Sequence, residues 1–171
     1  IHQKSFIHRN IKPEVFFVGS GKYNQSIIYL SNFFHCKQYY TEENKHISPG
    51  IGKRLVKDAN FCSISALRGQ ELSRKDDLES LGYVIAYFLK GNLPWFNLKG
   101  NSNEEIKNKI IELKTKFYEE DLKNEFPREF YKYFSHINGL KFDESHVIYG
   151  DYWMYSGESL AKDYVYGKRI V

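Results

Sequence analysis

The stretch from Ser73 to Trp95 has the pattern of a buried helix, and it constrains the fold more than any other part of the chain. Apolar side chains recur along it at helical spacing and leave few polar faces. They are Leu78, Leu81, Tyr83, Val84, Ile85, Ala86, Tyr87, Phe88 and Leu89. Ser73, followed by Asp76, suits an N-cap, and Gly91 with Pro94 beyond it marks the end. A helix this apolar is expected at the centre of a domain.

The composition predicts a folded intracellular domain. The 171 residues are 42% hydrophobic and 17% aromatic, which is enough to bury a sizeable core. The net charge of +4 comes without long runs of one sign, so nucleic-acid binding is not expected. Cys36 and Cys62 lack CxxC spacing and the histidines lack ligand spacing, so we expect reduced thiols and no metal site. No apolar run approaches the roughly 18 residues of a membrane span, and the first residues lack a signal-peptide pattern. We therefore expect no membrane contact and a cytoplasmic or nuclear location.

Residues 6–15 are a second informative stretch. In order, they include His8, Arg9, Asn10, Lys12, Pro13 and Val15. This spacing resembles the catalytic loop of protein kinases, whose pattern is His-Arg-Asp, then a Lys, then an Asn. The stretch 73–95, with its Leu-Pro-Trp ending, resembles the central helix of the large lobe in casein kinase I family protein kinases. The resemblance extends over residues 1–149 and implies a protein kinase-like large lobe.

Two chemistry-bearing positions of this loop differ from the family pattern. Asn10 stands where the resemblance places the catalytic Asp, and a neutral carboxamide cannot accept the proton of a substrate hydroxyl comparably. Val15 stands at the position of a metal-binding Asn and has no oxygen for magnesium. Lys12 matches the family Lys. The resemblance thus implies a degenerate catalytic pair, Asn10 and Lys12, and a lost metal ligand at Val15.

The stretch Asn32-Phe33-Phe34 resembles the Asp-Phe-Gly motif of the family. Asn32 replaces the Asp that bridges magnesium to the phosphates, while Phe33 keeps the hydrophobic residue and is expected to pack near His8. Phe34 in place of Gly removes backbone freedom. The resemblance also implies that Phe17 lies on the floor of an adenine pocket. An equally good interpretation of Phe17 is a core aromatic on a strand.

Other positions carry structural expectations. The resemblance implies that Asp77 reaches from the helix start to hold the backbone of the catalytic loop, in which His8 and Arg9 match the family. The alternative is that Asp76 and Asp77 only favour the helix dipole.

The stretch 35–72 has mixed polarity and resembles the activation segment and substrate platform of the family. Within it, Asn60 replaces an Arg that in the family helps to bind an anion such as a substrate phosphate, so a donor fork is lost.

The expected fold class is α+β and mainly helical. Apolar runs at 16–19 and 27–30, joined by a polar turn, predict a small hairpin. Apolar spacing predicts one helix over 103–117 and another from Pro127 to Gly139. Around the central helix, these elements would form a lobe like the C-terminal lobe of a protein kinase.

The domain organisation is expected to be one lobe, residues 1–149, followed by an unassigned aromatic and glycine-rich tail, residues 150–171. Aromatic residues of the tail would cover exposed core or contact a partner. The sequence shows no glycine-rich phosphate loop, Val-Ala-Ile-Lys strand or hinge, so the N-terminal lobe is expected to be absent. A central helix apolar on most sides then calls for a protein partner or the missing kinase lobe to cover it.

The preferred functional hypothesis is a catalytically inactive casein kinase I-like protein, a pseudokinase lobe with an interaction or scaffold role and no cofactor. The alternative is a divergent or truncated active Ser/Thr protein kinase that transfers the γ-phosphate of ATP to protein Ser/Thr, with ATP and magnesium as cofactors. A third alternative is a coding sequence that has lost its function, which a cooperative thermal transition would contradict.

Overall fold

The computed structural model describes residues 1–21, 23–43, 45–52 and 58–145, so the expected tail lies outside the described residues. The short 3₁₀ turns are η1 His2–Lys4, η2 Pro13–Val15 and η3 Phe33–His35. The strands are β1 Phe6–Ile7, β2 Phe16–Val18, β3 Ile28–Leu30 and β4 Lys37–Gln38. The helices are α1 Ile64–Leu67, α2 Arg74–Lys90, α3 Asn103–Lys116, the π-helical turn η4 Phe117–Asp121, α4 Leu122–Glu125 and α5 Arg128–Gly139.

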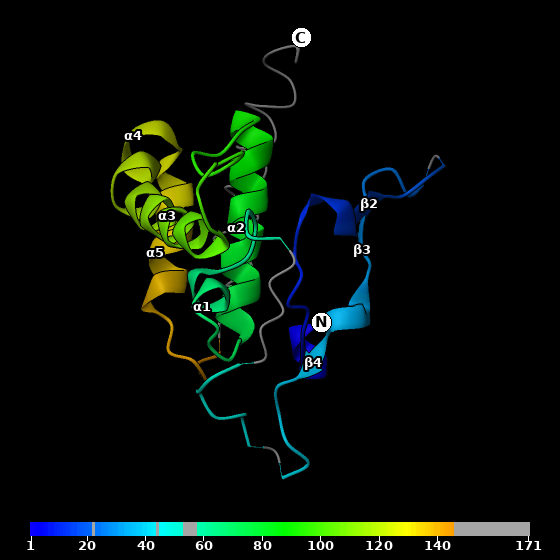
Figure 1. Cartoon of the computed structure of the whole chain (residues 1–171). Helices are drawn as coiled ribbons and strands as arrows, with labels where there is room; N and C mark the ends of the chain where they lie inside the picture. Colours follow the sequence, from blue (N-terminus) through cyan, green and yellow to red (C-terminus); the bar gives the residue numbers. More distant parts are fainter. Residues whose placement is uncertain (22, 44, 53–57, 146–171) are drawn as a thin grey trace.

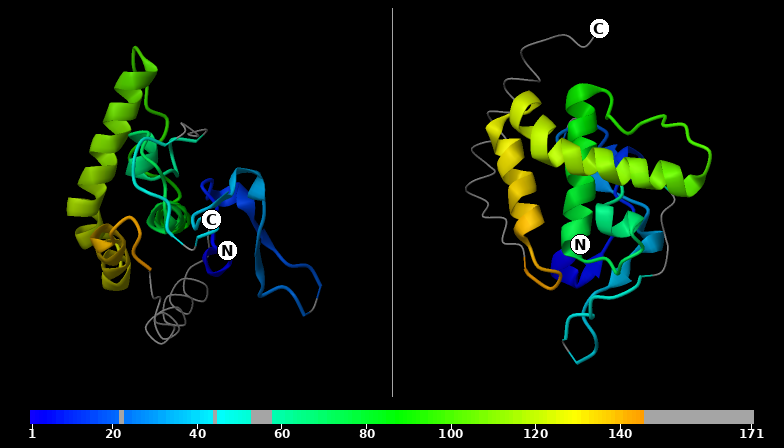
Figure 2. Two further views of the ribbon diagram at one scale, coloured as in Figure 1. Left: turned by 90° about the horizontal axis from the view of Figure 1, so that it is seen from below. Right: turned by 60° about the vertical axis from the view of Figure 1, so that its left-hand side comes forward.

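Helix α2 runs through the centre of the molecule, with α3, α4 and α5 on one side and the β2–β3 hairpin on the other (Figure 1, Figure 2). Its predicted ends are confirmed, since Ser73 is the N-cap and Gly91 follows the last turn. The Asp76 carboxylate accepts the Ser73 N–H at 2.7 Å, which gives a free amide at the helix start a partner. Gly91 has φ 74°, the left-handed conformation that ends helices at low cost when the residue is Gly.

The burial of α2 is uneven along its length. Tyr83, Val84 and Ala86 are at most 2% exposed, whereas Phe88 in the last turn is 63% exposed. The prediction that Phe88 belongs to a buried face is therefore wrong, because the described elements leave that turn uncovered. The helix is central but open at one end.

An aromatic cluster joins α2 to the helices beside it. The Trp95 and Phe117 rings meet edge to face at 5.3 Å, and Phe117 meets Phe134 of α5 at 5.9 Å. The Tyr133 hydroxyl donates to the Leu78 carbonyl at 2.7 Å, so the polar end of this ring has a partner inside the core. Edge-to-face ring packing of this kind holds α5 and the start of η4 against Trp95, just beyond α2.

The predicted helix over 103–117 is confirmed as α3, with Ser102 accepting the Glu105 N–H at its start. Ile110 faces the core and is 4% exposed. Phe117 begins the π-helical turn η4 instead of ending the helix, a change of helix type that the apolar spacing does not indicate.

The strands form two small antiparallel sheets. In the predicted hairpin, Phe17 pairs with Tyr29, which confirms that expectation. The other sheet pairs β1 with β4, two strands of two residues each, and was not predicted. No helix in the described part of the chain is both long and apolar enough to cross a membrane.

Candidate functional site

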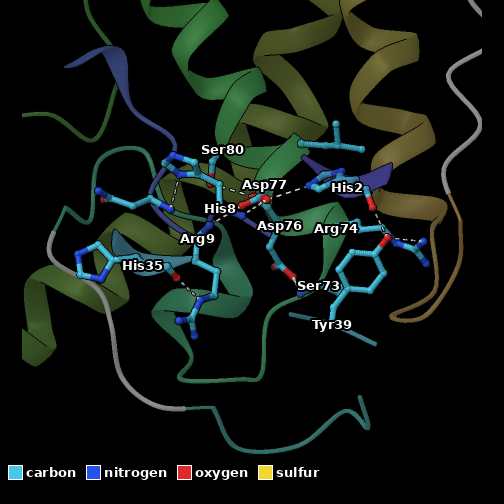
Figure 3. Close-up of polar contacts among 12 residues, drawn as sticks. His2, His8, Arg9, His35, Tyr39, Ser73, Arg74, Asp76, Asp77 and Ser80 are labelled. Atoms are coloured by element: carbon cyan, nitrogen blue, oxygen red, sulfur yellow. Dashed lines mark hydrogen bonds and ion pairs between the residues drawn. The ribbon is translucent and has the colours of Figure 1, made fainter. Parts of the chain in front are cut away.

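The candidate site is built where the first turn of α2 meets the loop that begins at His8 (Figure 3). Asp77 projects from α2 and accepts the His8 N–H at 2.6 Å through Oδ2 and the Arg9 N–H at 2.7 Å through Oδ1. The side chain is only 5% exposed, so these charge-assisted bonds are shielded from water. An effect on the helix dipole alone does not account for two such bonds. Asp77 fixes the loop backbone.

His2 makes a third contact with the same carboxylate. Its Nε2 lies 2.8 Å from Asp77 Oδ2, and the Tyr39 hydroxyl donates to the His2 carbonyl at 2.7 Å (Figure 3). These bonds tie η1 and the start of β1 to the base of the loop. Sequence reasoning missed His2, since a histidine in a short turn without ligand spacing carries no specific signal.

His8 connects the loop to the segment before Asn32. The imidazole is fully buried, and its Nδ1 accepts the Asn10 N–H at 3.3 Å. The hydrogen therefore lies on Nε2, which donates to the Ser31 carbonyl at 2.8 Å. The Phe33 ring meets His8 edge to face at 5.6 Å, so the expected contact between these residues is present.

Arg9 is held in an unusual backbone conformation. Its φ of 64° lies in the left-handed region, which costs a residue with a Cβ roughly 1–2 kcal/mol. Besides its amide bond to Asp77, its Nε donates to the His35 carbonyl at 2.7 Å (Figure 3). Partial burial lowers the pKa of the guanidinium, and the nearby Glu71 carboxylate opposes that effect. The bonds at Arg9 offset the strain and join the loop to η3.

The predicted catalytic pair lies within this fixed loop. Asn10 and Lys12 are both half-buried, and Lys12 has extended backbone dihedrals directly before η2. Asn10 and Lys12 thus lie in a loop whose backbone is held by Asp77, a residue of α2. Their catalytic roles stay predictions.

The predicted cofactor positions Val15 and Phe17 have opposite environments. Val15 is 0% exposed, and its carbonyl accepts both the N–H and the hydroxyl of Ser31, at 2.9 and 3.2 Å. Phe17 is 56% exposed, so its interpretation as a core aromatic is wrong: the described elements do not cover that face of β2. A place on the floor of an adenine pocket stays a prediction.

Asn32 precedes η3 in the left-handed conformation, with φ 62° and ψ 56°, which Asn tolerates better than most residues. The side chain is exposed. Phe34 lies within η3 and is 87% exposed. A non-glycine residue is accommodated there because the positive φ falls on Asn32 and not on Phe34.

The donor set at these positions does not fit magnesium well. Val15 offers a buried hydrocarbon and Asn32 one neutral carboxamide, whereas magnesium is held by carboxylates together with phosphate oxygens and water. Within the residues that the structure describes, no group of three or more His, Cys, Asp or Glu side chains is placed to hold a metal ion.

Comparison with known proteins shows the family to which the chain belongs. A model of the protein kinase domain matches residues 1–146. The chain is also 40% identical over 146 residues to casein kinase I homolog 2 of Schizosaccharomyces pombe, an alignment that covers 84% of this chain and 34% of that protein. The chain thus spans about a third of the length of this curated relative. It belongs to the protein kinase family, and within that family it is casein kinase I-like.

Proposed function

We propose that this chain is a catalytically inactive, casein kinase I-like lobe that acts through protein contacts. The loop frame made by Asp77, His8 and Arg9 is in place, with the backbone amides of His8, Arg9 and Asn10 all bonded. The side chains that phosphoryl transfer requires on such a frame are a base that orients the nucleophile and oxygen ligands for magnesium. Asn10 supplies no base.

The observation that carries the proposal is the pair of side chains at the family's metal positions. One is Val15, a hydrocarbon that is fully enclosed, and the other is Asn32, an exposed and uncharged amide. Without a carboxylate at either position, these residues offer the magnesium ion of a nucleotide complex no anionic ligand. ATP and magnesium are therefore not cofactors under this proposal.

Exposed apolar side chains on the hairpin support a protein partner. Phe17 of β2 is 56% exposed on one side of the hairpin, and Val18 with its pairing partner Ile28 of β3 is 70% and 69% exposed on the other (Figure 1). Large exposed apolar side chains gathered on one element favour an interaction site. Because the resemblance places the adenine pocket at Phe17, between two lobes, we propose the small lobe of a protein kinase domain as the partner of this hairpin. A cytoplasmic or nuclear location fits the free thiols of Cys36 and Cys62.

An active Ser/Thr kinase is the second candidate, and one observation favours it. Lys12 is retained, and Asp77 holds the start of its loop in a defined backbone conformation, with Arg9 in the left-handed region. Under this candidate, Lys12 would contact the γ-phosphate of ATP, and the chain would transfer it to protein Ser/Thr once a small lobe is supplied.

A paired measurement separates the two candidates. The thermal transition of the chain is recorded with ATP, with and without magnesium, and transfer of radiolabelled phosphate to casein is assayed with and without a separately produced small lobe of a casein kinase I. The proposal expects a cooperative transition, no magnesium-dependent shift and no transfer. It also expects the small lobe to bind, and to bind less well when Phe17 and Val18 are both replaced by Ser.

Three results would each contradict a part of the proposal. A magnesium-dependent shift with ATP would overturn its statement on cofactors. Casein phosphorylation that is lost in Lys12→Ala would establish the active kinase instead. Unchanged binding of the small lobe to the Ser variant would remove the hairpin as the docking element.

A further inference from the structure

The loop formed by residues 58–63 is held from below by a buried lysine of α3. Lys114 is 0% exposed, and its Nζ donates to the Cys62 carbonyl at 2.5 Å and to the Ala59 carbonyl at 3.1 Å. The same ammonium lies 4.3 Å from the centre of the Tyr83 ring and 5.3 Å from that of Trp95. Backbone carbonyls and two π-faces thus surround a side chain that is normally in water.

A residue of α2, Glu79, provides the acceptor for a backbone N–H at the end of the same loop. Glu79, which is 8% exposed, accepts the Ile64 N–H at 2.9 Å and the Tyr83 hydroxyl at 2.8 Å. An ammonium therefore binds carbonyl groups of the loop, and a carboxylate binds the first amide after it. The loop backbone is thus held by a lysine of α3 and by a glutamate of α2.

Two further side chains complete the frame. The Trp95 indole N–H donates to the Asn60 carbonyl at 2.8 Å, and the Ser63 hydroxyl donates to the Asp76 carboxylate at 2.7 Å. With Lys114 bound to the carbonyls of residues 59 and 62, three carbonyls of this short loop accept hydrogen bonds from fixed side chains. Its shape is set by groups that lie elsewhere in the chain.

Burial of an ammonium is costly unless its hydrogen bonds are made, so the bonds of Lys114 to the loop must offset its desolvation. A methionine of similar length would fill the space between Tyr83 and Trp95 without that cost. What the lysine adds, and a methionine cannot, is a pair of bonds to carbonyl oxygens.

We propose that Lys114 is a positioning residue, whose buried ammonium sets the backbone of the 58–63 loop. Because the stretch 35–72 resembles the substrate platform of the family, Lys114 would shape the surface on which a polypeptide lies. That consequence rests on the proposed function. The effect of Lys114 on the loop backbone does not, and this effect can be measured without any partner.

Cys62 reports the state of the loop through its thiol. The thiol is half-buried and donates to the Ala59 carbonyl at 3.7 Å, so opening of the loop exposes it. In a Cys36→Ser background, the rate at which Cys62 reacts with an aromatic disulfide reagent is compared between the parent chain and Lys114→Met. Lys116→Met, on the exposed side of the same helix, controls for charge removal. Ile137→Ala, a buried residue of α5, controls for a general loss of stability.

The proposal expects Lys114→Met to accelerate the reaction at least about ten-fold under native conditions, and neither control to do so at matched stability. Electrostatics alone gives the opposite sign: burial raises the pKa of Cys62 to about 11 and the Lys114 charge opposes this, so removing that charge from an unmoved loop would slow the reaction. An unchanged or slower reaction would therefore overturn the proposal.

A measurement on the unmodified chain covers the case in which Lys114→Met does not fold. Native-state hydrogen exchange at the Ile64 and Ala66 amides, which donate to Glu79 and Ser63, is expected to be as slow as at the centre of α2. Exchange at the rate of the exposed β2–β3 turn would show that the loop is not held, and would reject the assignment.

Discussion

Gly82 of α2 lies directly against Phe134 of α5. A Cβ built on Gly82 would come within 2.5 Å of Phe134 Cζ, and within 3.0 Å of Tyr133 Cε1. The two helices therefore approach each other at a point where α2 carries no side chain, and the aromatic rings of α5 fill that space.

Replacing this glycine tests the packing of α5 on α2. Gly82→Ala is expected to lower the free energy of unfolding by about 1–3 kcal/mol, since the overpacking outweighs the better helix propensity of Ala. Gly139→Ala, at the end of α5 with open space around its Cα, is the matched control and should be neutral or slightly stabilising. Urea unfolding measures both, and equal effects would contradict the close approach.

Asp77→Asn tests the anchor of the loop that begins at His8. The substitution keeps the shape of the side chain but places an NH₂ group opposite one of the donors His8 N–H, Arg9 N–H and His2. We expect a loss of about 3 kcal/mol in the free energy of unfolding, because a buried donor is left without an acceptor. A change below the error of urea unfolding would mean that the loop is held by other contacts.

Val15→Asn introduces the residue that the resemblance implies at a metal-binding position, and tests whether the site can accept it. The side chain of Val15 is fully enclosed, so an amide there is expected to cost about 2 kcal/mol of stability. We also expect no stabilisation by magnesium and ATP, measured by thermal shift. A stable variant with a magnesium-dependent shift would show that position 15 opens toward a ligand.

The buried carboxylates of α2 predict the pH dependence of stability. Burial raises the pKa of Glu79 above its ordinary value of 4.5, and Asp76 nearby adds to this effect; burial also raises the pKa of Asp76. A raised folded-state pKa gives stability that is fully present below pH 4.5 and is lost as the pH rises through the folded-state pKa. Glu79→Gln should therefore flatten the fall in stability between pH 4.5 and neutrality.

Urea unfolding across this pH range measures that slope. Glu112→Gln, an exposed position on α3, serves as the control and should leave the slope unchanged. A slope that is identical in Glu79→Gln and in the parent chain would show that Glu79 is not the group responsible.

The elements that could be predicted from the sequence are those whose signals are local. The ends of α2 at Ser73 and Gly91, the pairing of β2 with β3, and the extent of α3 all follow from spacing and capping within one short stretch. The β1–β4 pair could not be found in this way, because it joins Phe6 to Gln38 and each strand has two residues. Non-local pairing of such short strands leaves no periodic pattern.

The candidate site shows the same division. Asp77 could be placed on the loop only through the resemblance, since its partners lie 68 and 69 residues away in the sequence. The burial of Lys114 could not be predicted, because a lysine on an amphipathic helix normally faces water and its partners are carbonyls 52 and 55 residues earlier. The exposure of Phe17 and Phe88 could not be predicted either, because the burial of an aromatic side chain depends on which distant elements cover it.

The anchor of the loop lies in α2 and not in the loop itself, so the geometry of this loop and its reactivity are separate properties of the molecule. Asn10 is half-buried and Asn32 is exposed, and neither side chain takes part in the hydrogen bonds of Asp77 to the His8 and Arg9 amides. Replacing either Asn by Asp should therefore leave the loop backbone unchanged. The two carboxylates can be introduced one at a time, and whether each gives the chain any affinity for a nucleotide can be measured while the Asp77 contacts stay the same.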